Sequence, residues 1–176
     1  RGKRCWVGGK GGMRKWEWGR FGRKLGIARA VLQRVSDFDP ELGPGGLGFG
    51  ADSLLSWQVR EAGLRLRFIP EAVVIHDPDS SRLLRRQWLA AARDRGRRSA
   101  YLLHHWEHAA VRNPRIRICY LAAKLHLRRL LQPPPPIEAE GCAPWEISYV
   151  GGIEMCRHFL KERKRPRNYS KHGLGK

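Results

Sequence analysis

The eight residues from Gly43 to Gly50 constrain the fold more than any other part of the chain. Their sequence is Gly-Pro-Gly-Gly-Leu-Gly-Phe-Gly. Glycine loses more backbone freedom on folding than any other residue, so a run of glycines is unfavourable in a helix or a strand. We therefore predict a loop whose backbone approaches a neighbouring group closely, with regular elements on either side.

Apolar periodicity predicts those flanking elements. Residues 27–35 have a helical spacing that ends at a Ser-Asp pair, and residues 52–62 have a second one that ends at a glycine. Residues 64–69 alternate between apolar side chains and arginine, the period of a half-buried strand. A second short, β-branched run covers residues 72–75 and ends at His76. This part of the chain thus predicts helices together with strands.

The second half of the chain is more strongly helical and more basic. Residues 83–106 predict a long helical stretch broken near Gly96, and residues 116–131 predict an amphipathic basic helix. The four prolines at 133–136 predict a stiff, extended linker. Residues 145–163 predict a last helix, after which we expect a mobile basic tail.

Charge is divided unevenly along the chain. The net charge is +19, yet the stretch from Ser36 to Ser81 carries −5. The basic surroundings favour an anionic partner such as nucleic acid, anionic lipid or a phosphorylated small molecule. The four cysteines contain no Cys-x-x-Cys pair, so a zinc ribbon is not indicated. The absence of an export signal and of a long apolar run predicts a cytoplasmic protein with reduced thiols.

Several consecutive segments resemble the family-2 glycosyltransferases. The resemblance covers about residues 22–101 and rests on motifs that follow one another in the family's order. These are the Phe-Asp turn, the Gly-x-Asp opening of a helix and the Pro-x-Ala-x-Val-x-His strand, found here as Phe38-Asp39, Gly50-Ala51-Asp52 and Pro70-Glu71-Ala72-Val73-Val74-Ile75-His76. The chain departs from the family at Ala51, where glutamate is usual, and at Leu54, where a second aspartate is usual.

This resemblance implies an α/β fold, the acceptor-side portion of a GT-A-like mixed sheet followed by basic amphipathic helices. Residues 1–110 would form that partial domain without its amino-terminal donor-binding half, and residues 111–176 a basic helical extension. The implied reaction transfers a hexose from a nucleotide-sugar donor to a hydroxyl of a glycan or lipid-linked acceptor, with inversion. We expect this chain alone to be inactive.

The resemblance also implies roles for individual residues. Asp52 would be the general base that takes the proton from the acceptor hydroxyl. His76 would contact a divalent cation, Mn²⁺ or Mg²⁺, or the donor diphosphate. The residues expected to bind substrate are Gly48, Gly50, Trp57, Arg85 and Arg86. From the residue type alone, Asp52 would more simply cap its helix.

Two other classes of function stay open. The charge and the tryptophans suit a nucleic-acid-binding module, although no helix-turn-helix, zinc finger or RNP-like motif is present. The sequence His104-His105-Trp106-Glu107-His108 matches the H-x-x-E-H pattern of a zinc peptidase, with two histidines four residues apart. The basic helix and tail also suit a peripheral contact with an anionic membrane, at its inner face in the cytoplasm.

Overall fold

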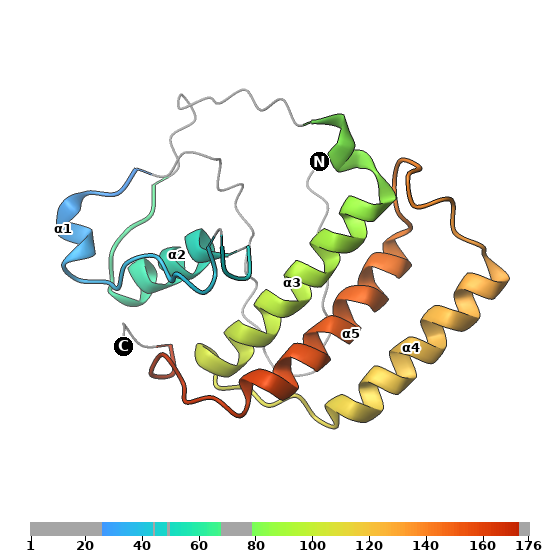
Figure 1. Ribbon diagram of the computed structural model, residues 1–176. Coiled ribbons are helices and arrows are strands. Elements are labelled where there is room, and N and C mark those ends of the chain that lie inside the picture. The colour runs from blue at the N-terminus through green and yellow to red at the C-terminus, as the bar shows by residue number, and fades with distance from the viewer. Residues whose placement is uncertain (1–25, 44, 49, 68–78, 173–176) are drawn as a thin grey trace.

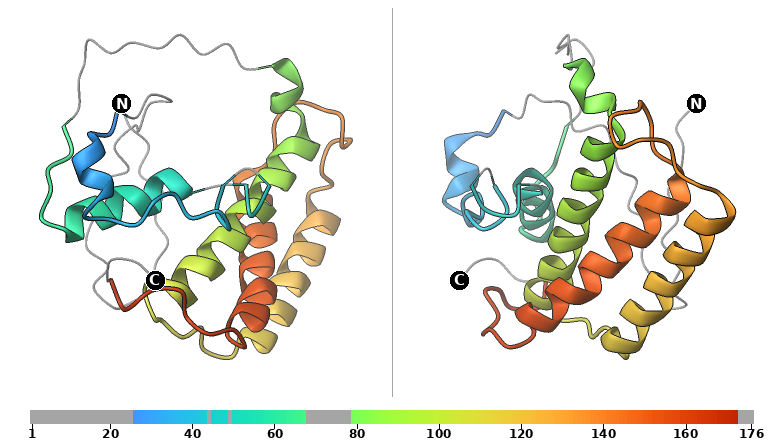
Figure 2. Two further views of the ribbon diagram at one scale, coloured as in Figure 1. Left: turned by 60° about the vertical axis from the view of Figure 1, so that its left-hand side comes forward. Right: turned by 45° about the vertical axis from the view of Figure 1, so that its right-hand side comes forward.

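The computed structural model describes residues 26–43, 45–48, 50–67 and 79–172. The helices in these residues are α1 (Arg29–Leu32), α2 (Ala51–Glu61), the 3₁₀ helix η1 (Ser80–Leu83), α3 (Arg85–His105), α4 (Pro114–Leu131) and α5 (Pro144–Glu162). Across the molecule they lie in the order α2, α3, α5, α4, with α5 between α3 and α4 (Figure 1). Two further views keep this order and place α1 and α2 on the side of α3 away from α4 (Figure 2).

The predicted α/β fold with a GT-A-like mixed sheet is wrong. The described residues form an all-helical structure without a sheet. The β pairing found among them is one isolated antiparallel bridge between Leu84 and Glu140.

The described part of the first predicted strand, residues 64–67, has no regular secondary structure. Leu64 and Leu66 pack against a buried cluster, while the two arginines beside them are exposed. The alternation therefore predicted which side chains turn inward, but no second strand pairs with this segment in the part of the chain that the structure describes. Residues 68–78, with the second predicted strand, lie outside that part.

Helix α3 is continuous where a break was predicted. Gly96 lies in its middle and is buried. A Cβ atom at Gly96 would overlap the carbonyl oxygen of Gly151 on α5, and a Cβ atom at Gly151 would lie 3.1 Å from the carbonyl oxygen of Ala92. The missing side chains let the two helix backbones approach closely. This packing outweighs the roughly 1 kcal/mol by which glycine disfavours a helix interior.

A buried ion cluster joins the three long helices. Glu146 of α5 is fully buried and accepts hydrogen bonds from Arg85 of α3, with Nε–Oε2 and Nη2–Oε1 distances of 3.0 and 2.5 Å. Arg129 of α4 donates two more, at 2.9 and 2.6 Å. Burial opposes ionisation of Glu146, but the hydrogen bonds from Arg85 and Arg129 outweigh it and lower the pKa of this carboxyl.

The helices predicted at residues 52–62, 116–131 and 145–163 are confirmed as α2, α4 and α5, within two residues at each end. Helices α4 and α5 each begin with a proline at the first helical position, where the missing N–H is not needed. The helix predicted at residues 27–35 is shorter and consists of the single turn α1. A helix as short as the predicted one is only marginally stable by itself.

The α1–α2 side of the molecule has its own small core, formed by Val35, Leu55 and Val59. A larger cluster joins this side to the end of α3 and to the carboxy-terminal tail, and consists of Leu42, Leu54, Tyr101, Leu102, Trp106 and Tyr169. The tail was expected to be mobile, yet Tyr169 is buried in this cluster. Helices α3 and α5, which lie on either side of the predicted domain boundary near residue 110, pack directly on each other.

None of the helices in the described residues is long and apolar enough to cross a lipid bilayer.

Candidate functional site

Asp52 lies in the first turn of α2 and is exposed. The residue before this helix is Gly50, so the simpler prediction that Asp52 is the capping residue does not hold. Its Oδ1 atom accepts a hydrogen bond from the backbone N–H of Ser53 at 2.8 Å. Free backbone N–H groups make the start of a helix partly positive, so this carboxylate lies in an anion-favouring position.

Arg98 of α3 reaches this position from the neighbouring helix. Gly50 has a φ of +101°, in the left-handed region, and a Cβ atom there would overlap Cδ of Arg98. Burial lowers the pKa of the Arg98 guanidinium, and the negative charge of Asp52 raises it in part. The glycine thus allows an arginine side chain to pass over the loop backbone and to interact electrostatically with Asp52.

The other glycine and the tryptophan of the predicted substrate site are placed differently. Gly48 has a φ of +78°, is exposed and has open space where a side chain would lie. Trp57 is half-buried, and its ring packs against Trp106 with the ring centroids 6.4 Å apart. Trp57 follows Asp52 by five residues on α2, about 140° around the helix, so the two side chains point in different directions.

The two arginines predicted to bind substrate lie far from Asp52. Arg85 is buried and bonded to Glu146, whose hydrogen bonds raise the pKa of the guanidinium. Arg86 is exposed next to it. Both are at the start of α3, about 20 Å along the helix from Arg98. The structure therefore does not bring them together with Asp52, and His76 lies outside the described residues.

Asp39, of the Phe-Asp turn, is a buried hydrogen-bond centre. Its Oδ2 atom accepts hydrogen bonds from the hydroxyls of Tyr101 and Tyr169, at 2.6 and 2.5 Å. Burial, followed by the bond to Asp39, raises the pKa of both tyrosines, so they remain protonated donors. Asn168 donates to the Tyr101 hydroxyl and to Glu41, both at 2.8 Å. This polar junction connects the start of the glycine loop with α3 and the tail.

The same junction continues through a buried histidine. His105 Nδ1 accepts from the backbone N–H of Asn168 at 3.0 Å, and its Nε2 atom lies 2.9 Å from Oε2 of Glu162. A ring nitrogen that accepts carries no proton, so His105 is neutral and donates through Nε2. Burial lowers the pKa of His105, in agreement with this tautomer. Arg165 bridges Glu162 and Glu41.

The H-x-x-E-H pattern does not form a helical zinc-ligand pair. Helix α3 ends at His105, and His108 has a left-handed φ of +51°. His104 and His108 instead contact the backbone carbonyl oxygens of Arg165 and Tyr169, at 3.0 and 2.9 Å. Both histidines therefore help to fasten the tail.

The described residues contain no group of three or more His, Cys, Asp or Glu side chains that could hold a metal ion. Of the two literal Asp-x-Asp sequences, the first includes Asp39, which is engaged by the tyrosines. The second includes Asp79, whose carboxylate accepts the Ser81 N–H at 2.8 Å and caps η1. That backbone hydrogen bond lowers the pKa of Asp79.

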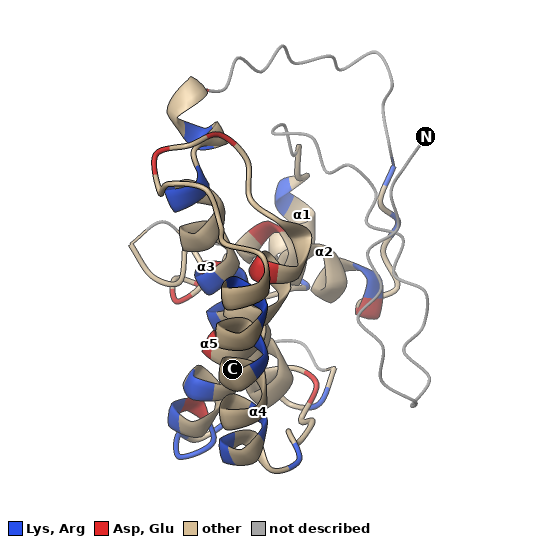
Figure 3. Cartoon of the chain, turned by 90° about the vertical axis from the view of Figure 1, so that its right-hand side faces the viewer, with Lys and Arg blue, Asp and Glu red and all other residues tan. Residues whose placement is uncertain are grey.

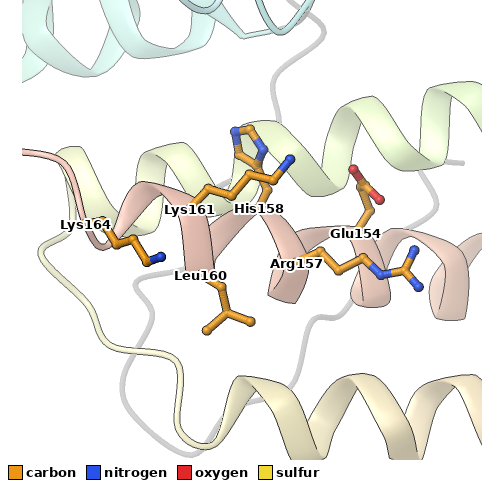
Figure 4. Close-up of a pocket in the computed structure, with 6 residues that line it drawn as sticks. All are labelled: Glu154, Arg157, His158, Leu160, Lys161 and Lys164. Atoms are coloured by element: carbon orange, nitrogen blue, oxygen red, sulfur yellow. The ribbon is translucent and has the colours of Figure 1, made fainter.

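A shallow depression runs along α5, away from Asp52. Its described lining residues are Glu154, Arg157, His158, Leu160, Lys161 and Lys164 (Figure 4). None of them belongs to the predicted site. The depression is open and carries no arrangement of groups typical of catalysis.

Sequence reasoning missed the approach of Arg98 to the glycine loop before Asp52 and the whole polar junction. Arg98 is one of seven arginines between Arg82 and Arg98, and nothing in that pattern distinguishes it. In the chain, Asp39 is 62 residues from Tyr101 and 130 residues from Tyr169. Asn168 is 67 residues from Tyr101. Gly50, two residues before Asp52, was the sequence feature that indicated a close approach by another group, which the structure shows to be Arg98.

Comparisons of the chain with protein family models, with curated proteins and with solved structures found no match.

Proposed function

We propose that this chain contributes the catalytic base of an inverting glycosyltransferase, and that Asp52 is that base. The observation that carries the proposal is the exposed Asp52 carboxylate at the start of α2, directly after the glycine loop, where the Arg98 side chain packs against Gly50. The resemblance of residues 22–101 to family-2 glycosyltransferases supports the same role. The proposal does not depend on the sheet, which is absent from the described residues.

In the proposed reaction, the acceptor hydroxyl lies against the Asp52 carboxylate. As the acceptor oxygen attacks the anomeric carbon of the donor, its proton passes to Asp52. The bond from that carbon to the diphosphate breaks, and the nucleoside diphosphate leaves with the electron pair. Attack from the side opposite to the leaving group inverts the anomeric centre. The helix start and Arg98 supply positive charge near the anionic groups of this reaction.

The donor-binding unit and the divalent cation remain predictions. The described residues do not fit a metal site, because Asp39 is engaged elsewhere and Asp52 has no neighbouring ligand set. We therefore assign no step to a cation. We place the protein in the cytoplasm, and the free thiols of Cys119, Cys142 and Cys156 suit that compartment.

The test is turnover of nucleotide sugars by the complete translation product that carries this chain. A panel of uridine-, guanosine- and thymidine-diphosphate sugars is offered with lipid-linked and free glycan acceptors, with Mn²⁺, Mg²⁺ or a chelator. We expect Asp52→Asn to lower the rate of nucleoside diphosphate release by about 10²–10⁴-fold, the usual contribution of a general base. Glu61→Gln, which removes an exposed carboxylate at the other end of α2, is the matched control and should leave the rate unchanged.

Equal rates for Asp52→Asn and the parent protein would remove Asp52 from the mechanism. Turnover by the 176-residue chain alone would instead contradict the expectation that this chain is inactive by itself.

A further inference from the structure

Helix α4 presents two different faces. Its inner face packs on α5: Leu125 contacts the cluster around Leu89 and Val150, and Leu121 lies against Gly152. Arg129, on this inner side, bonds to Glu146. The packing therefore fixes which side of α4 faces the protein and leaves the other side outward, at the edge of the molecule (Figure 1).

The outward face carries a continuous apolar stripe. It consists of Ile116, Tyr120, Leu127, Leu130 and Leu131, which are 55–74% exposed. At 100° per residue these side chains fall within about 100° of the helix circumference. Over the described residues these are the five most exposed of the large hydrophobic side chains, and all belong to this one helix. The stripe is about 22 Å long.

Basic side chains border the stripe. Arg117, Lys124 and Arg128 lie along one edge and Arg115 along the other, and all four are exposed. The Lys124 amine lies 4.7 Å from the ring centre of Tyr120, which belongs to the stripe. Helix α4 contains no acidic residue, so blue segments follow it without a red one (Figure 3).

We propose that the outward face of α4 docks on an anionic lipid surface. Large apolar side chains enter the boundary between headgroups and acyl chains, and the bordering basic side chains meet lipid phosphates. The charge complementarity selects this occupant. A second copy of the chain would bring two basic borders together, and a nucleic acid would leave five large apolar side chains without an apolar environment. The inference is independent of the role of Asp52.

The experiment is flotation of the 176-residue chain with vesicles of phosphatidylcholine alone or with one quarter phosphatidylglycerol. We expect the anionic vesicles to bind at least tenfold more tightly than the neutral ones, with affinity falling as salt increases. A triple variant Ile116→Ser, Leu127→Ser and Leu130→Ser should lose at least tenfold in affinity. Its matched control, Leu32→Ser with Leu83→Ser, removes exposed leucines elsewhere and should bind as the parent does.

A second variant removes charge: Arg117→Gln, Lys124→Gln and Arg128→Gln. At about fivefold for each basic side chain near an anionic surface, its affinity should fall by about 100-fold. Arg60→Gln, Arg65→Gln and Arg67→Gln change the net charge equally on exposed residues of the α2 side and should have a much smaller effect. Circular dichroism of all four variants establishes that each keeps its helices.

Equal binding to neutral and anionic vesicles would overturn the proposal, as would undiminished vesicle binding by the Ile116–Leu127–Leu130 variant. Absence of vesicle binding would also overturn it. If that absence came with duplex or single-stranded nucleic acid binding that the charge variant loses, the occupant would be nucleic acid. If it came with dimerisation that the apolar variant loses, the occupant would be a second copy.

Discussion

The two sides of the molecule are held together by different means. The layer of α3, α5 and α4 depends on close helix packing at Gly96 and on an ion cluster around one buried glutamate. The glycine loop and α2 are joined to that layer through a polar junction centred on Asp39 and through the buried hydrophobic cluster that contains Leu54, Trp106 and Tyr169 of the tail. The layer would thus be expected to form from its own helices, whereas the α2 side needs a contact made by residues near the end of the chain.

The largest expected effect concerns the helical layer. Replacing Glu146 by Gln leaves Arg85 buried without its charged partner, which typically costs about 3–5 kcal/mol of the free energy of unfolding. Urea unfolding followed by circular dichroism measures this loss. The control Glu138→Gln removes an exposed carboxylate and should change stability by less than about 0.5 kcal/mol. Similar stabilities for the two variants would mean that the cluster does not hold the layer together.

A smaller and more local effect is expected at the polar junction. Tyr169→Phe removes one of the hydroxyls that donate to the buried Asp39 carboxylate, and a hydrogen bond to a charged group contributes about 1.5–3 kcal/mol. Amide hydrogen exchange should accelerate in residues 39–62 and remain slow in α3 and α5. Tyr120→Phe, on an exposed tyrosine of α4, is the control. Uniform acceleration in both regions would show that the two sides unfold as one unit.

The smallest expected effect is the pH dependence of the junction. His105 is neutral when folded and its pKa is lowered by burial, so below a pH of about 6.5 the unfolded chain binds more protons than the folded one. Stability should therefore fall as the pH is lowered from 7.5 to 5.5, at no more than about 1.4 kcal/mol per pH unit for each proton. His158, whose pKa burial also lowers, acts in the same direction.

Urea unfolding midpoints at the two pH values give this dependence. His105→Gln should flatten it, whereas His126→Gln, at an exposed position on α4, should leave it as it is. A steeper fall for His105→Gln than for the parent chain would assign the pH dependence to other groups.

Local periodicity predicted the helices well and the fold class poorly. A 3.6-residue repeat is a property of one segment, and α2, α4 and α5 follow it. The Leu-Arg alternation before Pro70 was equally local and correctly predicted that Leu64 and Leu66 face a core. A sheet, however, requires a partner strand, and no periodicity within one segment shows whether a partner exists. The predicted break near Gly96 failed for the same reason, because the compensating backbone contact comes from α5.

The candidate site was predicted only in part. The glycine loop and the carboxylate that follows it are visible in the sequence as neighbours, and Asp52 is exposed at the start of a helix as expected. Arg98 was one arginine among several, and only the fold brings it over Gly50. Arg85 and Arg86 were implied by the family resemblance, yet both lie at the end of α3 far from Arg98, and Arg85 is buried against Glu146.

The sequence alone was enough to locate α2, α4, α5 and the glycine loop, and to show that positive charge surrounds an acidic middle. These features depend on residues that are close together in the chain. Contacts between distant parts of the chain made some polar side chains structural and left others exposed. Asp39, Glu146 and His105 are buried by partners more than fifty residues away, and Asp52 is not. Burial is a property of the packed molecule, because the free energy of a charge depends on everything that replaces water around it.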